Sequence, residues 1–219
     1  MTYGLSDVFA DSKPCTIEDV KNTLLEKNIS QLWTFLKGAA FYNDHQMLKY
    51  ILDLNICTSK DFLFNILIYN IEEINFDCFV LLLDAIDDIE HENGRLLHAI
   101  IEQGDISLME EVVKRGVDMH VYNDFLLHSA VTNLDFHMFK YLCELNIYDM
   151  HKNIDSILYF LAKSTTKKSV MIMEYMEKNY HDILDSANMR PIFDRCRRIA
   201  SQHDNIYFMK IFKRYIKNG

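Results

Sequence analysis

An internal repeat constrains the fold of this chain more than any other feature. The segment Asp88–His98 recurs 30 residues later as Asp118–His128, with Asp, Asn, Leu-Leu and His at matching positions. A third copy begins at 148–151, where Tyr-Asp-Met-His repeats the Val-Asp-Met-His of 117–120 at an offset of 31. Periods of this size are typical of arrays in which each repeat packs only on its neighbours.

The repeat extends beyond these central copies. Residues 36–56 align with 127–147 at an offset of 91, which is close to three periods. We therefore expect a repeat array over 31–217, clearest at 88–151, preceded by an N-terminal segment and capping helix at 1–30.

The pattern within each unit predicts a helical hairpin. Apolar residues recur at helical spacing in two short bursts, for example in 96–101 and again in 106–113. Between the bursts stands an Asp that can cap the second helix, and after it a Gly or Asn that suits a left-handed C-terminal cap. The residues in these roles are Asp105, Asp135, Gly116 and Asn146.

An all-α solenoid of about five to six hairpins, with divergent capping elements, follows from this pattern. Only 6 Gly and 2 Pro occur, so the turn punctuation of an all-β fold is missing. A lone helix is expected at 17–27, and loops at 117–123 and 147–154. The helical pairs are expected at about 31–55, 61–86, 94–116, 124–146, 155–179 and 190–217.

These units resemble ankyrin repeats. The motifs that match the ankyrin pattern are Leu97-His98, Leu127-His128, Gly104-Asp105, Gly116-Val117-Asp118 and the small residue Ala130. The Thr-Pro of the pattern is replaced by Arg95-Leu96 and Phe125-Leu126, which leaves the repeat count open. The repeat period of 30 and the motif Gly-x-Asp-x-His-x-x-Asn-Asp-x-x-Leu at 116–127 are similar to those of ankyrin proteins from giant and large DNA viruses. The resemblance implies a non-catalytic module that binds another protein and, if viral, a host protein.

Charge and composition narrow the function further. The net charge of −9 argues against nucleic acid as the main partner. The charge is uneven, because 181–219 carries 8 basic and 4 acidic side chains. The five cysteines are too scattered for a zinc ribbon or a redox pair, and catalytic and phosphate-binding motifs are missing. We expect no enzyme activity, cofactor, bound metal or membrane span, and a monomer in the cytoplasm, that of the host if the chain is viral.

Candidate binding residues lie at the tips of the loops and the starts of the first helices, which line the binding surface of a solenoid. Tyr122 and Leu126 are expected to be exposed anchors, and a merely solvated polar loop is the alternative. The candidate residues are His91, Asn93, Leu96, His120, Tyr122, Asn123 and Leu126.

Two further groups have a structural and a functional interpretation. His98 and His128 fall early in first helices, where an imidazole can tie neighbouring loops together by hydrogen bonds, and a metal ligand or a general base is the functional alternative. A basic element at about 190–217 is expected to form a polar cap, and a nucleic-acid or acidic-partner site is the alternative. The residues of that alternative patch are Arg195, Arg197, Arg198, Lys213 and Arg214.

Overall fold

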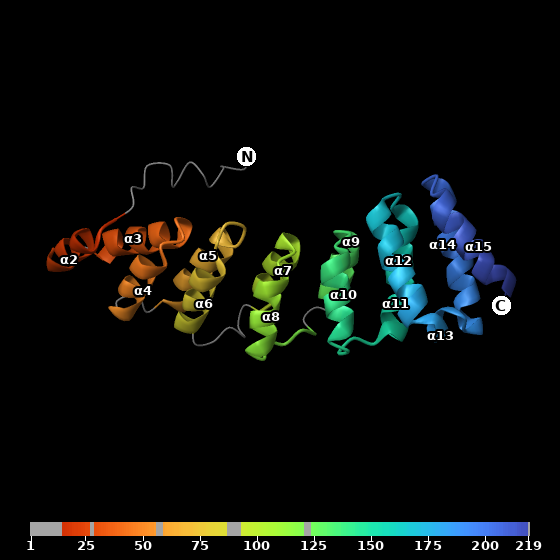
Figure 1. Ribbon diagram of the computed structural model, residues 1–219, viewed down its shortest axis with the longest axis horizontal. Coiled ribbons are helices and arrows are strands. Elements are labelled where there is room, and N and C mark those ends of the chain that lie inside the picture. Colours follow the sequence, from red (N-terminus) through yellow and green to blue (C-terminus); the bar gives the residue numbers. More distant parts are fainter. Residues whose placement is uncertain (1–14, 27–28, 56–58, 87–92, 121–123, 219) are drawn as a thin grey trace. The chain divides into compact units, whose positions relative to one another are not determined.

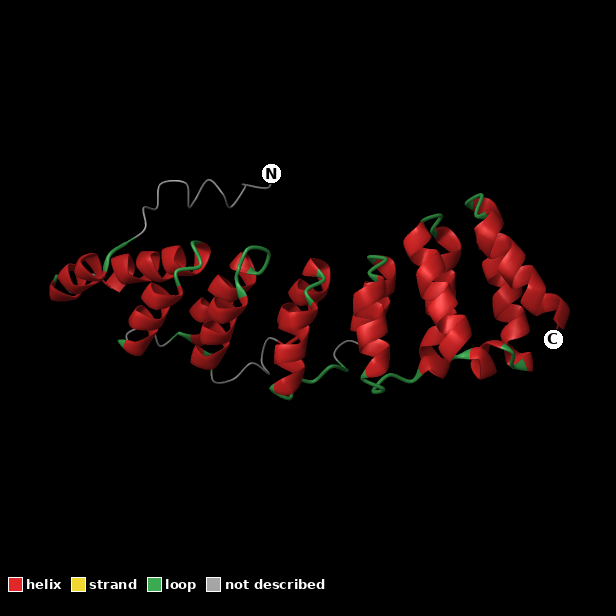
Figure 2. Ribbon diagram, viewed as in Figure 1, coloured by secondary structure: helices red, strands yellow, loops and turns green. Residues whose placement is uncertain are grey.

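The structure, a computed structural model, is built from helices. It describes residues 15–26, 29–55, 59–86, 93–120 and 124–218. Helices account for most of these residues, and no strand occurs among them (Figure 2). The expectation of an all-α fold is therefore confirmed.

Contacts group the chain into two compact units. Unit 1 comprises residues 1–103 and 110–117, and unit 2 comprises residues 104–109 and 118–219. The boundary falls within helix α8 (Ile106–Lys114), whose first turn belongs to unit 2.

Unit 1 consists of two layers of helices. The first helices of successive hairpins, α3, α5 and α7, pack side by side, and the second helices α4 and α6 pack against each other and on their own partners α3 and α5 (Figure 1). A separate helix, α2, packs on α3. The bounds are α2 (Ile17–Leu25), α3 (Ile29–Phe41), α4 (His45–Asp53), α5 (Lys60–Asn70), α6 (Phe76–Ala85) and α7 (Asn93–Gln103).

Unit 2 repeats this arrangement, and its later helices, from α11 on, include four of 13 or 14 residues. α9, α11 and α14 pack in succession, α10 packs on α9 and α12, and α15 packs mainly on α14. The short helices α13 and η2 connect α12 to α14. The bounds are α9 (Phe125–Thr132), α10 (Phe136–Glu144), α11 (Met150–Lys163), α12 (Lys167–Asn179), α13 (His181–Leu184), η2 (Ala187–Met189), α14 (Arg190–Gln202) and α15 (Ile206–Asn218).

A capping side chain begins the second helix of every hairpin. The Oδ1 atoms of Asp105 and Asp135 accept hydrogen bonds from the backbone N–H groups three residues later, at 3.2 and 3.0 Å, as the sequence predicted. The same capping hydrogen bond also occurs in the hairpins whose sequence repeat is faint. Its capping residues there are Asp44, Asn75, Thr166 and Asn205.

Residues with a left-handed backbone conformation recur along the chain at the same period. Gly116 and Asn146 follow second helices with φ of 78° and 53°, which confirms the predicted C-terminal caps. Gly104 and Leu134 precede the capping aspartates with φ of 75° and 54°. A Cβ on Gly104 would lie 2.7 Å from Oδ2 of Asp135, so any larger residue there would have to displace the Asp135 carboxylate.

One predicted loop is shorter than expected. The segment 147–154 was predicted to be irregular, but α11 begins at Met150. The reason is a cap: Oδ1 of Asp149 accepts a hydrogen bond of 3.0 Å from the N–H of His151. His151 therefore lies in a helix and not in a loop.

Candidate protein-binding surface

The first helices of unit 1 carry an aromatic and cationic cluster. The indole of Trp33 is 39% exposed, and its ring centroid lies 4.9 Å from that of Phe62 on the neighbouring helix α5. Nζ of the exposed Lys37 lies 5.3 Å from the centroid of the same Phe62 ring. Two adjacent helices therefore hold an indole, a phenyl ring and an ammonium group together.

The same face continues across α5 and α7. Tyr69 is 59% exposed, near the C-terminal end of α5. On α7, Nη2 of Arg95 donates a 3.3 Å hydrogen bond to Oδ1 of Asn65, and the guanidinium lies 5.4 Å from the Phe64 ring centroid. Nδ1 of His98 lies 3.2 Å from Oε2 of Glu102, one turn along the same helix. We call this surface the first-helix face and define it by Trp33, Lys37, Tyr69, Arg95 and His98.

Helix phase explains why these side chains are exposed. Leu32 and Leu36 of α3 are buried and lie four residues apart on one face of the helix. Trp33 and Lys37 each come one residue later, so they share a second face that is rotated about 100° from the first. The sequence reasoning missed this pair. The available signal was the chain's one Trp, standing one position after a buried-face leucine.

The structure contradicts part of the predicted site. Leu96 and Leu126 were expected to be exposed on the binding surface, but both are 0% exposed. Leu96 is on α7, which packs on α5, and Leu126 is on α9, which packs on α11. A helix that packs on a neighbouring first helix buries a wider arc than a helix with one free side. Neither leucine is available as an anchor for a partner.

Three of the other candidates, His91, Tyr122 and Asn123, lie outside the described residues. Asn93 begins α7, and its side chain also lies outside them.

His120 is exposed, as expected, but it takes part in contacts within unit 2. Its Nδ1 lies 3.2 Å from Oδ1 of Asp124, and its ring meets the Tyr148 ring edge-on at 5.7 Å. The other carboxylate oxygen of Asp124 accepts a 2.9 Å hydrogen bond from Nδ2 of the buried Asn153. Burial alone would raise the pKa of Asp124, but the hydrogen bonds from Asn153 and His120 outweigh burial and lower it. His120 is thus part of a structural network that joins the loop before α9 to α11.

The two first-helix histidines differ from each other. Nδ1 of His98 lies 3.2 Å from a carboxylate oxygen of Glu102 on its own helix. Nδ1 of His128 is buried and has no hydrogen-bond partner among the described residues. The predicted tie between neighbouring loops is therefore wrong for this atom of His128.

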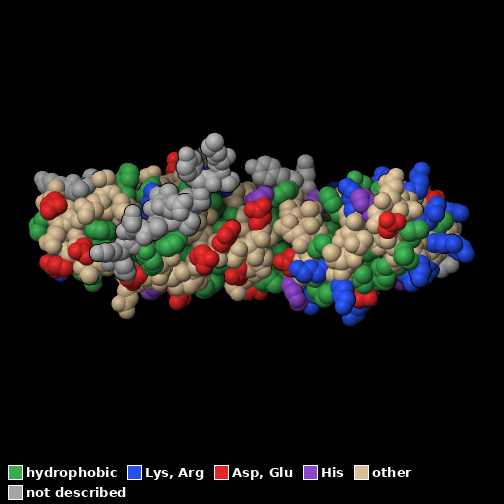
Figure 3. Space-filling view, turned by 90° about the horizontal axis from the view of Figure 1, so that it is seen from above, with side chains coloured by type: hydrophobic (Ala, Val, Ile, Leu, Met, Phe, Trp, Pro, Cys, Tyr) green, Lys and Arg blue, Asp and Glu red, His purple; other side chains and the backbone are tan. Residues whose placement is uncertain are grey.

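The arginines of the alternative basic patch are mostly engaged within unit 2. Arg195 pairs with Asp155 and Arg214 with Glu177. Arg197 lies 3.8 Å from Asp194, and Nε of Arg198 donates to the Asp194 carbonyl at 3.3 Å. Basic side chains gather over the last helices (Figure 3).

Cysteine chemistry is unfavourable for catalysis at the buried positions. Burial raises the pKa of the thiols of Cys78, Cys143 and Cys196 to about 11. A raised thiol pKa is the opposite of what a nucleophilic cysteine needs. The described residues also contain no cluster of three metal-ligand side chains. Within the same residues, the helices fall short of the length and apolar character that crossing a membrane requires.

Comparison with known proteins supports the interpretation of the repeats. Neither a family model nor a solved structure matches the chain. A putative ankyrin repeat protein of fowlpox virus is 26% identical over 149 residues, covering 66% of this chain and 36% of the viral protein. The chain therefore spans well under half the length of this relative. Ankyrin-repeat proteins are generally non-catalytic and bind other proteins. With its helical hairpins and its similarity to a poxvirus protein of this kind, the chain is confirmed to resemble the ankyrin-repeat proteins of large DNA viruses.

Proposed function

We propose that this chain is a non-catalytic scaffold that binds another protein through the first-helix face of unit 1. The supporting observation is the cluster of Trp33, Lys37 and Phe62 on α3 and α5. Trp, Tyr and Arg are the residues that most often dominate the energy of protein interfaces, and Trp33, Tyr69 and Arg95 share this face.

The cluster is well suited to binding because it is already ordered. Its side chains stand on helices and contact each other, so they lose less conformational entropy when a partner binds than isolated surface side chains would. The loop-tip residues predicted from the sequence stay part of the proposal, without the two buried leucines. They are His91, Asn93, His120, Tyr122 and Asn123.

The similarity to a fowlpox protein supports a more specific role. We propose that the chain acts as a viral effector on a host protein in the cytoplasm of the infected cell.

The test is capture of proteins from infected or transfected host cells, quantified by mass spectrometry. A Trp33→Ala/Tyr69→Ala variant should lose at least about tenfold of a specific captured protein, since interface anchors contribute 2 kcal/mol or more each. The matched control is Tyr159→Ala/Met171→Ala, which removes two comparably exposed side chains from unit 2. Equal capture by both variants would exclude the first-helix face. Loss only in a His120→Ala/Tyr122→Ala variant would move the site to the loop tips.

A further inference from the structure

Helix α15 presents one outward face that is apolar at its start and cationic along the rest. Ile206, Lys210, Lys213 and Lys217 are exposed and follow each other at spacings of three and four residues, which places them on one stripe. The stripe is about 16 Å long at the rise of an α-helix. No acidic residue occurs anywhere in 206–218.

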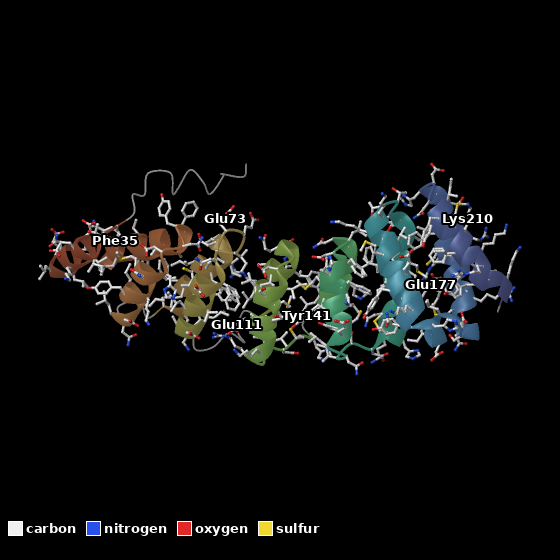
Figure 4. The ribbon with its side chains drawn as sticks, in the orientation of Figure 1. Phe35, Glu73, Glu111, Tyr141, Glu177 and Lys210 are labelled. Carbon is white, nitrogen blue, oxygen red and sulfur yellow. The ribbon has the colours of Figure 1, made fainter. Side chains whose placement is uncertain are left out.

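The lysines of this stripe differ from the arginines beside them. Arg195 and Arg214 reach back to carboxylates on α11 and α12, of which Glu177 on α12 is labelled together with Lys210 on α15 in Figure 4. Lys210, Lys213 and Lys217 form no ion pair with any residue in the described part of the chain, in contrast to Arg195, Arg197 and Arg214. The charges of Arg195 and Arg214 are therefore paired with carboxylates of the fold, whereas the charges of the three lysines face solvent.

The inner face of α15 holds this stripe in place. Phe208 and Phe212 are fully buried, and the Phe193 ring of α14 stacks on Tyr215 at a centroid distance of 4.6 Å. The exposed lysines consequently project from a helix that is packed along its length. Ile206 is 65% exposed, which leaves an apolar group at one end of the stripe.

We infer that this stripe binds an acidic amphipathic helix of a partner protein. Carboxylates on a partner helix at positions i, i+3 and i+7 have the same spacing as Lys210, Lys213 and Lys217. An apolar residue one turn before them would cover Ile206. Nucleic acid fits less well, because a phosphate backbone gains nothing from Ile206 and the chain as a whole carries −9. The stripe belongs to unit 2 and its function does not depend on the first-helix face of unit 1.

The experiment uses the full chain and a fluorescent synthetic helix of about four turns with Glu at i, i+3 and i+7 and Leu at i−4. Its binding is followed by anisotropy at about 50 and 150 mM salt, because the Debye length shortens over this range. We expect saturable binding that weakens at the higher salt. Reversal in Lys210→Glu/Lys213→Glu/Lys217→Glu should weaken it at least about tenfold, and neutralisation to Gln by a smaller factor.

The matched control reverses three exposed lysines of α12, Lys167, Lys168 and Lys178, and should change the affinity by less than about twofold. A peptide with the same composition but scrambled Glu positions should bind more weakly than the designed one. No binding at low salt, equal loss in the α12 control, or tighter binding of duplex DNA or RNA than of the peptide would each overturn the inference. The Gln variant and a circular dichroism melt of each protein distinguish loss of the surface from loss of the fold.

Discussion

Unit 1 and unit 2 are built from the same helical hairpin but differ in charge. Unit 1 carries 9 basic and 19 acidic side chains, a net charge of −10, whereas unit 2 carries 14 and 13, a net charge of +1.

The units also differ in where polar side chains join one repeat to the next. In unit 1 Asn43 makes this contact at the exposed hairpin turn: its Nδ2 donates to the carbonyl of Glu73 at 2.7 Å, and its Oδ1 accepts from the N–H of Asn75 at 2.6 Å (Figure 4 labels Glu73). In unit 2 the equivalent contacts are made by Asn153 and Asn205, each 4% exposed. A buried polar contact costs more to break than an exposed one, because water does not replace the lost partner. The two units therefore use hydrogen bonds of similar geometry with different consequences for stability.

The largest expected effect is common to both units. Leu97 of α7 and Leu127 of α9 occupy matching positions and are 0% exposed. Leu97→Ala and Leu127→Ala should each lower the free energy of unfolding by about 2–5 kcal/mol, since each leaves a cavity. Hydrogen exchange measured by mass spectrometry should show the loss of protection concentrated in the unit that carries the change. Equal loss throughout the chain would show that the two units unfold as one.

The second prediction compares the cost of breaking a buried inter-repeat contact in unit 2 with that of breaking an exposed one in unit 1. Nδ2 of Asn205 donates to the carbonyl of Ser164 at 2.6 Å and to that of Ala162 at 3.3 Å, while its Oδ1 caps α15. Asn205→Ala should cost about 2–4 kcal/mol, because it removes a cap and leaves buried carbonyls without a donor. In unit 1, Asn43→Gly keeps the left-handed φ of 55° and should cost only about 1 kcal/mol. Chemical denaturation of both variants measures these costs, and a larger cost at Asn43 would contradict the distinction between buried and exposed ties.

The smallest expected effect concerns the stability of the fold at low pH. The pKa of Asp124 in unit 2 is lowered because hydrogen bonds from Asn153 and His120 outweigh the effect of burial, and the pKa of Asp19 in unit 1 is lowered by hydrogen bonds from Thr16. A carboxylate with a lowered folded pKa stabilises the fold above its unfolded pKa of about 3.9, and this contribution is lost as the pH falls through the folded value. Asp124→Asn should remove part of the acid sensitivity that unit 2 shows as the pH falls below about 4. Asp19→Asn should have less effect, since Asp19 is exposed to solvent. Thermal melts at pH 7 and pH 3 test this order, and an unchanged acid response in Asp124→Asn would contradict it.

The sequence alone determined those features that depend on short-range chemistry. An amphipathic period predicts a helix, an Asp before it predicts a cap, and a Gly or Asn after it predicts a left-handed turn; Asp105, Asp135, Gly116 and Asn146 all behave in this way. Their conformations follow from contacts within a few residues, so no knowledge of the tertiary packing was needed.

The tertiary structure decided which side of each helix faces solvent. Leu96 and Leu97 are adjacent in sequence and point about 100° apart on a helix, yet both are 0% exposed. Periodicity alone favoured only one buried stripe, whereas a helix that also packs on a neighbouring first helix, as α7 does on α5, buries a wider arc. For the same reason, the partnership of Trp33 with Phe62 and the engagement of Arg195 and Arg214 by carboxylates were not visible in the sequence. They join residues about 29 to 40 positions apart, and only the stacking of repeats brings such residues into contact.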